Sequence, residues 1–438
     1  MTKTPRILIV GGGYVGMYTA LRLRRKLRRG EATVTVVDPS PTMTYQPFLA
    51  EVAAGWIEPR HAVVPLRKVL RGCEVLTGRV TGLDPARRVA TVDGTVLVPY
   101  DVLVLAPGSV SRTLPVPGLA EHAVGFGTVA EAVHLRNTVL ARLDEASSTT
   151  DPARRRAALT FTVVGAGYSG VEVLAELADL ARYTLRHHPA LDPAELRWVL
   201  VEATDRVLPE VSLPLAGRTA DRLRRLGIEV RLGTRLVSVL DGRVRLSDGV
   251  EYESGTVVWT TGVRANPLAA RLGLPVDARG RLLCDVDLRV RGVPGGWAAG
   301  DAAAVPDLTR PGELCGPSAQ HAVRQAARLA LNIVAALRGR PVKPYRHPYA
   351  GSVASLGRHQ GVAEVYGVRL VGWPAWVLHR VYHLSRVPTL DRKLRVLADW
   401  TLTAVLRREV VGLAQLEHPR RDWEHATGEH SAAGTTAA

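Results

Sequence analysis

A glycine-rich turn near the start of the chain restricts the possible folds more than any other feature. A short apolar stretch, Arg6–Val10, is predicted to be a strand, and it runs directly into a turn that contains Gly11, Gly13 and Gly16. A helical stretch follows, and then a second apolar stretch that ends on Asp38. This order predicts a β-α-β unit with a G-x-G-x-x-G turn at its first corner.

Each glycine has its own role in such a turn. Gly11 permits the tight bend, Gly13 lets a pyrophosphate approach the backbone, and Gly16 lets the helix pack close to the strand. The N-terminus of the helix presents free N–H groups and a partial positive charge to the phosphates. Asp38 lies 22 residues after Gly16 (38 − 16 = 22), where a carboxylate accepts hydrogen bonds from ribose hydroxyls. The unit is therefore predicted to bind a dinucleotide.

The same pattern begins again 154 residues later (165 − 11 = 154). The strand 161–164 precedes a second G-x-G-x-x-G turn, a helix is expected over about 171–185, and the next strand ends on Glu202. Each half continues with an Asp-Gly hairpin turn and a buried strand that ends near a glycine. The repeat predicts two nucleotide-binding halves whose dinucleotides face each other. The polar stretch 144–156 is expected to be flexible.

Composition narrows the function further. The 438 residues suffice for two or three domains. The net charge of +16 favours anionic partners, although a general preference for arginine would explain part of it. Nucleic acid is not expected, because no helix-turn-helix or aromatic–basic RNA motif is evident. The three cysteines form no C-x-x-C pair, so neither zinc nor another metal is expected. No apolar run is long enough for a membrane-spanning helix.

Several ordered segments resemble one known group of proteins. The two glycine turns, Asp38, and the segments LAPGS (105–109) and AAGDAAA (298–304) resemble the flavoproteins of the pyridine nucleotide-disulphide oxidoreductase superfamily. Within that superfamily the chain is similar to the type II NADH:quinone oxidoreductases, the single-chain NADH dehydrogenases that do not pump protons. The finer likeness rests on the segments YQPFLAEVAAG (45–55), GAGYSGVEVLAEL (165–177), VVWTTGVRANPL (257–268), PSAQHAVRQAARLALNI (317–333) and LGRHQGVAEVYGVRLVGWPAWVLHRVYHL (356–384).

The resemblance implies an FAD site in the first half. Val80 would meet the adenine through its backbone, and Asp301 would bind the ribityl–phosphate region. The residues expected to contact FAD are Gly11, Gly13, Gly16, Asp38, Val80, Gly108, Asp301 and Ala319.

The resemblance places NADH in the second half. Glu202 favours NADH over NADPH because a carboxylate repels a 2′-phosphate, but the nearby Arg206 leaves NADPH open as an alternative. Glu172, expected in the first turn of its helix, would approach the nicotinamide and the flavin. Its alternative role is that of a favourable anion at a helix N-terminus. The residues expected at NADH are Gly165, Gly167, Gly170, Glu202 and Gly262.

The quinone would bind beside Gln46, Gln320 and Arg324, with Glu172 and Gln320 as the catalytic residues. The chain departs from the family pattern at two positions. Pro107 stands where a threonine is common, which removes one backbone donor. Arg324 stands where many members have glutamine, and glutamine here occupies position 325. The second departure puts the polarity of the quinone pocket, and hence the acceptor, in question.

The C-terminal region contains the candidate membrane contacts. Apolar residues with helical spacing, among them Trp373, Trp376, Leu394 and Leu397, alternate with arginines. This pattern fits helices that lie on an anionic lipid surface. The alternatives are a homodimer interface or an ordinary core face. The histidines have no metal-ligand spacing and are expected to be surface or packing residues.

Together these features predict an α/β fold with two Rossmann-like dinucleotide-binding domains and a C-terminal membrane-proximal α+β region. The expected domains are FAD-binding (1–115 and 290–340), NAD(P)H-binding (116–289) and membrane-association or dimerisation (341–425), followed by a disordered tail (426–438). The expected protein is peripheral on the cytoplasmic face of the cell membrane. A soluble flavoprotein reductase with another acceptor is the main alternative. A sulfide:quinone oxidoreductase lacks support from these isolated cysteines, and a redox-sensing binding protein stays open.

Overall fold

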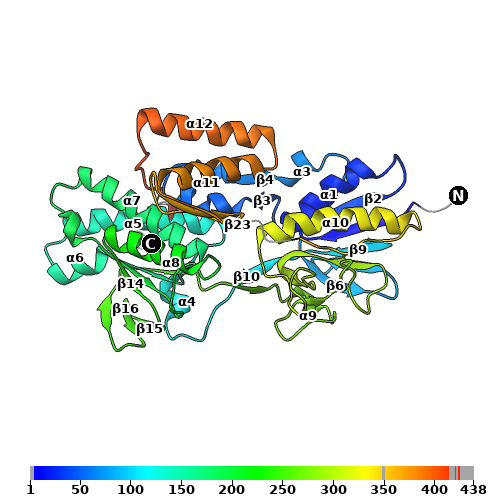
Figure 1. Cartoon of the computed structure of the whole chain (residues 1–438), viewed down its shortest axis with the longest axis horizontal. Coiled ribbons are helices and arrows are strands. Elements are labelled where there is room, and N and C mark those ends of the chain that lie inside the picture. The colour runs from blue at the N-terminus through cyan, green and yellow to red at the C-terminus, as the bar shows by residue number, and fades with distance from the viewer. Residues whose placement is uncertain (1–3, 348–350, 414–419, 421–422, 425–438) are drawn as a thin grey trace, which may run out of the picture.

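Two five-stranded parallel sheets form the centres of two lobes (Figure 1). The computed structural model describes residues 4–347, 351–413, 420, 423 and 424. In the first sheet the strand order is β21-β9-β1-β2-β5, and every pair of adjacent strands is parallel. Its strands are β1 (Arg6–Val10), β2 (Thr33–Asp38), β5 (Glu74–Thr77), β9 (Val102–Leu105) and β21 (Gly296–Ala298).

Apolar residues explain why these strands lie at the centre of the first lobe. Ile7, Leu8, Ile9 and Val10 are all buried, as expected for a parallel strand that is covered on both faces. Helices α1 (Tyr14–Lys26) and α10 (Ala319–Leu337) lie against each other beside the sheet (Figure 1). An antiparallel sheet shares the core, and its strands are β6 (Val80–Asp84), β7 (Val89–Val92) and β8 (Val96–Pro99).

The second lobe repeats this arrangement. Its parallel sheet has the order β11-β18-β12-β13-β14. In both sheets the strand that enters the glycine turn is central and is flanked by the strand that follows its helix. The second sheet is made of β11 (Ala123–Gly125), β12 (Thr160–Val164), β13 (Arg197–Val201), β14 (Ile228–Arg231) and β18 (Thr256–Trp259). The predicted α/β fold with two Rossmann-like halves is confirmed.

Helices and a small antiparallel sheet complete the second lobe. The helices α5 (Val129–Ser148), α7 (Tyr168–Thr184) and α8 (Leu213–Arg225) are longest in this half, and the small sheet contains β15 (Leu236–Leu240), β16 (Arg243–Leu246) and β17 (Glu251–Glu253). The expectation of a flexible stretch over 144–156 was wrong, because most of it lies in α5 and in α6 (Pro152–Ala158). Leu143 and Ala146 continue the buried stripe of α5, so packing outweighs the polar composition of the segment.

The two halves are joined by a pair of antiparallel segments. Strand β10 (Ser109–Ser111) leaves the first lobe and pairs with β19 (Val263–Ala265), which returns to it. Leu274 and Leu288 are then buried in the core of the first lobe. This packing favours a domain boundary near residue 263 rather than the expected residue 290. The other domain limits stay a prediction, and the expected tail, 426–438, lies outside the described residues.

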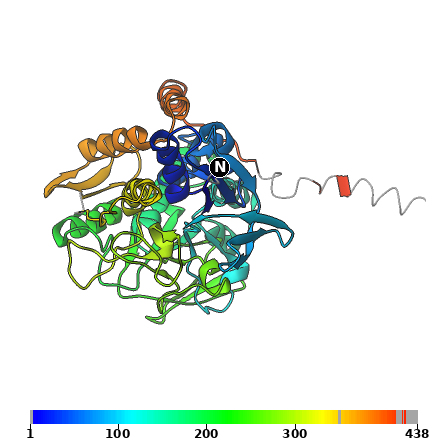
Figure 2. The same ribbon diagram turned by 90° about the vertical axis from the view of Figure 1, so that its right-hand side faces the viewer.

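The C-terminal region forms a third layer that contacts both lobes. A three-stranded antiparallel sheet packs under α11 (Trp373–Arg386), and α12 (Leu390–Leu406) is the outermost helix, seen end-on at the top of Figure 2. The Tyr18 hydroxyl on α1 donates to the Arg386 carbonyl (3.1 Å), and strand β23 lies against α7. The sheet strands are β23 (Gly351–Ser355), β24 (Gly361–Val365) and β25 (Val368–Val371).

The third glycine of each turn is a direct test of this packing. A Cβ on Gly170 would lie 1.9 Å from the Gly165 carbonyl oxygen, so Gly170→Ala must push α7 away from β12. We expect it to lower the free energy of unfolding by about 3 kcal/mol or more. The control is Gly217→Ala on α8, where a Cβ meets nothing within 4 Å and should stabilise by about 0.5–1 kcal/mol. Thermal unfolding of both variants checks the difference, and equal midpoints would contradict it.

Candidate functional site

The two glycine turns have almost the same geometry. Gly11 has φ +103° and Gly165 has φ +105°, in a region that L-residues rarely adopt. A Cβ on Gly16 would lie 1.7 Å from the Gly11 carbonyl oxygen, so the helix touches the turn. Gly13 and Gly167 instead face open space, since a Cβ on either would meet no atom within 4 Å. Each turn therefore packs tightly on one side and leaves room on the other.

An acidic side chain lies across each turn. Asp38 accepts hydrogen bonds from the backbone N–H of Gly12 (2.6 Å) and of Ser40 (2.7 Å). Glu202 accepts the corresponding bond from the N–H of Ala166 (2.6 Å), and another from Thr204 (2.8 Å). Burial raises the pKa of Asp38, although these N–H donors favour its ionised form. Both acids are thus held beside the space that the middle glycine leaves open.

These two turns fit the pyrophosphates of two dinucleotides. Neither α1 nor α7 has an acidic residue in its own first turn, so no side chain of that turn competes with an anion for the positive end of the helix dipole. Asp38 and Glu202 retain oxygen lone pairs that can accept from ribose hydroxyls. Val80 begins β6 two residues after Gly78, whose N–H donates to the Asp38 carbonyl (3.0 Å). Val80, expected at the adenine of the first dinucleotide, therefore lies close to Asp38 in the fold.

Asp301 lies where the first sheet meets α10. It is part of a short turn after β21, and the Ser109 hydroxyl donates to its Oδ2 (2.7 Å). The N–H of Gly300 donates to the side-chain oxygen of Gln325 (2.7 Å). Gln325 is buried and therefore fixes this turn from behind. Burial also raises the pKa of Asp301. Gln325, which stands one position after the glutamine of the family pattern, thus has a structural role at this turn. The side chain of Arg324 is not used there.

A cavity of about 650 Å³ lies between the two turns. Both halves and the C-terminal region line it. A second cavity of about 270 Å³ shares part of the same wall, including Tyr14, Arg324 and His383. The sequence-predicted residues that line the larger cavity are Gln46, Glu172, Gly262, Asp301, Ala319, Gln320 and Arg324. The other predicted residues, among them Gly108 with φ +69° at the end of the first sheet, are not part of the cavity lining.

Glu172 is held by the C-terminal region. Helix α7 begins at Tyr168, so Glu172 lies in its second turn, not in the expected first turn. This position removes the alternative of a simple helix N-terminal anion. The N–H of Ser355 donates to Glu172 Oε1 (3.0 Å), and His379 Nε2 lies 3.1 Å from the same oxygen. Burial disfavours the charged form of His379, but Glu172 and the other nearby carboxylates outweigh it and raise the pKa.

The residues expected at the quinone occupy one end of the cavity. Gln320 donates from Nε2 to the Gly351 carbonyl (3.1 Å), and its Oε1 lies 3.2 Å from His347 Nε2. Arg324 donates to the Gln320 carbonyl (3.2 Å). Gln46 is more exposed, and it donates to the Gly127 carbonyl (3.4 Å). A cation at position 324 therefore replaces a neutral amide in the wall that both cavities share.

Sequence analysis missed the role of two histidines. The histidines were expected to be surface or packing residues, but His379 is buried on α11 and its ring lies 4.5 Å from that of the half-buried His383. Tyr45 Oη lies 3.3 Å from His383 Nδ1. Burial lowers the pKa of His383 well below its usual value, and the charge of His379 adds to this effect. The i, i+4 spacing of the two histidines was a signal, but it did not identify their partners on α7 and near β3 (Thr42–Thr44).

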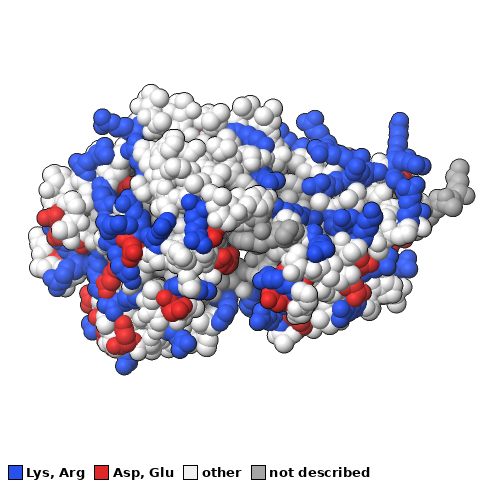
Figure 3. All heavy atoms as spheres, in the orientation of Figure 1, with Lys and Arg blue, Asp and Glu red and all other residues white. Residues whose placement is uncertain are grey.

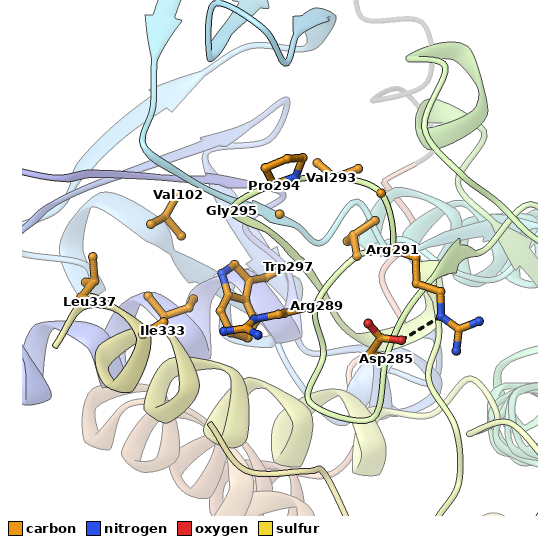
Figure 4. A pocket seen from close by; sticks show the side chains of 14 residues that line it. Val102, Asp285, Arg289, Arg291, Val293, Pro294, Gly295, Trp297, Ile333 and Leu337 are labelled. Carbon is orange, nitrogen blue, oxygen red and sulfur yellow. Dashed lines mark hydrogen bonds and ion pairs between the residues drawn. The ribbon is translucent and has the colours of Figure 1, made fainter. Parts of the chain in front are cut away.

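A further hollow lies away from this site. Figure 4 shows a pocket of about 460 Å³ at the opposite end of β21, between the loop that precedes the strand and the C-terminal half of α10. Arg291 pairs with Asp285 (2.8 Å) beside it, and the Arg289 guanidinium lies 5.2 Å from the Trp297 ring centre. None of the predicted site residues lines this pocket. Within the described part of the chain, no three metal-ligating side chains cluster and no helix is suited to span a membrane.

Known proteins share these features. The family model of the pyridine nucleotide-disulphide oxidoreductases matches residues 5–326. The type II NADH:quinone oxidoreductase Ndh of Mycobacterium tuberculosis is 33% identical over 92% of this chain and 89% of its own length. A type II NADH:quinone oxidoreductase of Staphylococcus aureus is 29% identical over 86% of this chain and 93% of its own.

A solved structure shares the fold. NDH2 from Plasmodium falciparum in complex with NADH superposes with a TM-score of 0.84 at 18% identity, covering 93% of this chain and 100% of that one. The extent of the sequence matches, together with two glycine turns that open toward one cavity, assigns the family. The chain belongs to the pyridine nucleotide-disulphide oxidoreductases and, within them, to the type II NADH:quinone oxidoreductases.

Proposed function

We propose that this protein oxidises NADH and passes two electrons by way of FAD to a membrane quinone, without pumping protons. One observation carries the proposal: a single cavity has walls from the first half (Asp301), the second half (Glu172) and the C-terminal region (His383). A flavin and a nicotinamide that extend from the two turns would meet there. FAD, when bound, supplies the hydride and electron-transfer chemistry, and the protein supplies position and electrostatics.

The two turns have matching roles in this proposal. The open side of Gly13 and the N-terminus of α1 hold the FAD pyrophosphate, and Asp38 binds its ribose. Gly167 and α7 do the same for NADH, with Glu202 on the ribose. The close packing of the outer glycines fixes each helix N-terminus, so the two cofactors are oriented before they react. Asp301 and Gly262 border the place where they meet.

The wall residues of the smaller cavity would receive the quinone. Gln320 and Arg324 offer polar groups in its wall, and Tyr14 and Tyr45 supply aromatic ones. Gln46 lines the adjoining larger cavity. Reduction of a quinone to a quinol needs two protons, of which the hydride of NADH supplies one and solvent the other. Glu172 borders the larger cavity and its carboxyl oxygen lies 3.1 Å from His379 Nε2, so this pair is placed to pass on the second proton.

The exposed apolar crest of α12 favours a membrane acceptor over the soluble-reductase alternative. Figure 3 shows this crest as a largely uncharged ridge, with Lys and Arg side chains gathered over α1 and α10 beside it. Its side chains are 48–73% exposed, namely Leu390, Leu394, Leu397, Leu402, Val405 and Leu406. An apolar ridge beside basic residues suits an anionic lipid surface, and we propose peripheral attachment at the cytoplasmic face. A homodimer contact through the same ridge is the competing occupant.

The turnover itself tests the proposal. The purified protein should contain about one non-covalent FAD, and NADH should bleach the flavin absorbance. A short-chain quinone should then restore that absorbance and be consumed in equal amount with NADH. A folded protein that cannot be loaded with FAD, or a reduced flavin that no quinone reoxidises, would contradict the proposal. In the second case a different acceptor would take the electrons.

Glu202 should decide between NADH and NADPH. Its carboxylate lies across the second turn and would accept from the ribose hydroxyls while repelling a 2′-phosphate. Because a hydrogen bond to a charged group contributes about 1.5–3 kcal/mol, Glu202→Ala should raise the KM for NADH about tenfold or more and narrow the preference over NADPH. Stopped-flow bleaching with both nucleotides measures this. Glu253→Ala, at an exposed carboxylate of the same half, should change neither rate, and equal wild-type rates would argue against Glu202.

Membrane binding should depend on the crest of α12. Leu402 and Val405 are 56% and 73% exposed, and replacing both with Glu places two charges where the lipid surface would lie. We expect this variant to lose co-sedimentation with anionic vesicles at low salt. The matched control is Leu97→Glu on β8, an equally exposed leucine (64%) in the first lobe. Sedimentation of the double variant with vesicles, or dissociation of a dimer instead, would contradict the lipid assignment.

A further inference from the structure

Helix α7 carries a row of three carboxyl groups that the reaction described above does not fully use. Glu172, Glu176 and Asp179 follow one another at helical spacing. Only Glu172 borders the cavity. Glu176 is 1% exposed and Asp179 pairs with Arg408, so both lie beneath the C-terminal region. A buried carboxyl is costly unless its oxygens have partners, and the partners of Glu176 indicate what it does.

One residue of strand β23 contacts two of these acids. The N–H of Ser355 donates to Glu172 Oε1 (3.0 Å), and its hydroxyl donates to Glu176 Oε1 (2.7 Å). Ser355 is itself buried at 3% exposure. The backbone of Ser355 therefore holds Glu172 at the cavity. The side chain of Ser355 is itself held by Glu176, one helical turn further along α7. A shift of β23 along α7 would break both bonds together.

A tryptophan closes the other side of Glu176. The Trp56 indole N–H donates to Glu176 Oε2 (2.9 Å), so both oxygens of the carboxyl have a donor. Trp56 follows α2 (Leu49–Ala53) of the first half and is 7% exposed. Glu176 thus joins three parts of the chain that are far apart in sequence: α7, the segment after α2, and β23.

The charged groups next to Glu176 pair with one another. Three cations face it or its neighbours: His379 and Arg380 from α11, and Arg408 from the segment after α12. Three anions oppose them, namely Glu172, Asp179 and Glu51 of α2. Burial raises the pKa of Glu176 to about 7, with the charges of Arg408, Glu51 and Asp179 as smaller influences. Burial therefore favours the neutral form of Glu176 below neutral pH.

We propose that Glu176 and Ser355 form a clamp that positions Glu172 at the cavity, so that both are positioning residues for the reaction. The inference rests on the role proposed above for Glu172. Because β23 belongs to the sheet on which α11 packs, the clamp also fixes His379 opposite Glu172. The packing of the C-terminal region on α7 thereby sets the position of the Glu172 carboxyl. Loss of the clamp should impair the step that needs Glu172, while both glycine turns should still bind their cofactors.

Two substitutions at one position separate this role from simple packing. Glu176→Gln keeps the shape, and its amide can accept from Trp56 and donate to the Ser355 hydroxyl. Glu176→Leu keeps the volume but loses both bonds. In the FAD-loaded full-length protein we expect Gln to retain the turnover of NADH with a short-chain quinone. Leu should lower kcat by on the order of 10- to 100-fold, as misplacement of a reacting group does, with FAD content and the KM for NADH unchanged.

Ser355 supplies a milder pair in case the leucine variant fails to fold. Ser355→Ala removes the bond to Glu176 and should lower kcat in the same direction, and Ser355→Thr, which keeps the hydroxyl, should restore it. The pH profile is a further readout. Since the folded pKa of Glu176 lies above that of an unfolded glutamate, the neutral carboxyl stabilises at low pH and this contribution is lost as pH rises through about 7. Glu176→Gln should remove that loss of thermal stability.

Glu172→Gln, measured beside these variants, separates failure of the clamp from failure of the proposed function. If Glu172→Gln lowers kcat, then adding Glu176→Leu to it should cause no further loss, because the clamp acts through Glu172. Additive losses would overturn the clamp and leave the role of Glu172 intact. If Glu172→Gln turns over at the wild-type rate, the role of Glu172 fails and the clamp with it. Wild-type kcat and pH profile in Glu176→Leu would overturn the clamp alone.

Discussion

The close approach of a helix to the strand before it, made possible by a missing side chain, is the contact on which the rest of this structure depends. The Gly16 and Gly170 positions admit no Cβ, because the carbonyl oxygens of Gly11 and Gly165 occupy that space. This contact aims each helix N-terminus at the open side of its turn. If either helix moved outward, the pyrophosphate site that we propose at its turn would move away from the cavity between the lobes.

The second physical feature is the burial of opposite charges beneath the C-terminal region. Arg380 lies 4.3 Å from the Trp376 ring centre and 3.5 Å from Glu51, and Arg408 lies 4.0 Å from the Trp56 ring centre. Charges taken out of water need such partners, and removing one leaves the other uncompensated. The region is consequently attached by specific polar contacts as well as apolar ones. The outer surface of the region is left apolar, so a lipid surface or a second protein molecule could cover it.

These contacts change the meaning of the C-terminal region. From its apolar and basic pattern it was expected to attach the protein to a membrane, with a homodimer interface or an ordinary core face as the alternatives. In the structure it also completes the cavity, because α11 contributes His383 to the wall and His379 to Glu172. The proposed attachment and the proposed chemistry therefore depend on the same region of the chain.

The sequence alone determined the two β-α-β units, the acids that end their second strands, and the hairpins, because each is a local pattern whose geometry follows from a few adjacent residues. Asp93 and Gly94, for example, both adopt positive φ in the predicted turn. Only the tertiary structure decided that Ser355 and His379, 183 and 207 residues after Glu172, meet its carboxyl. No local signal encodes that meeting, since it depends on how three separately formed layers pack and on where buried charges find partners.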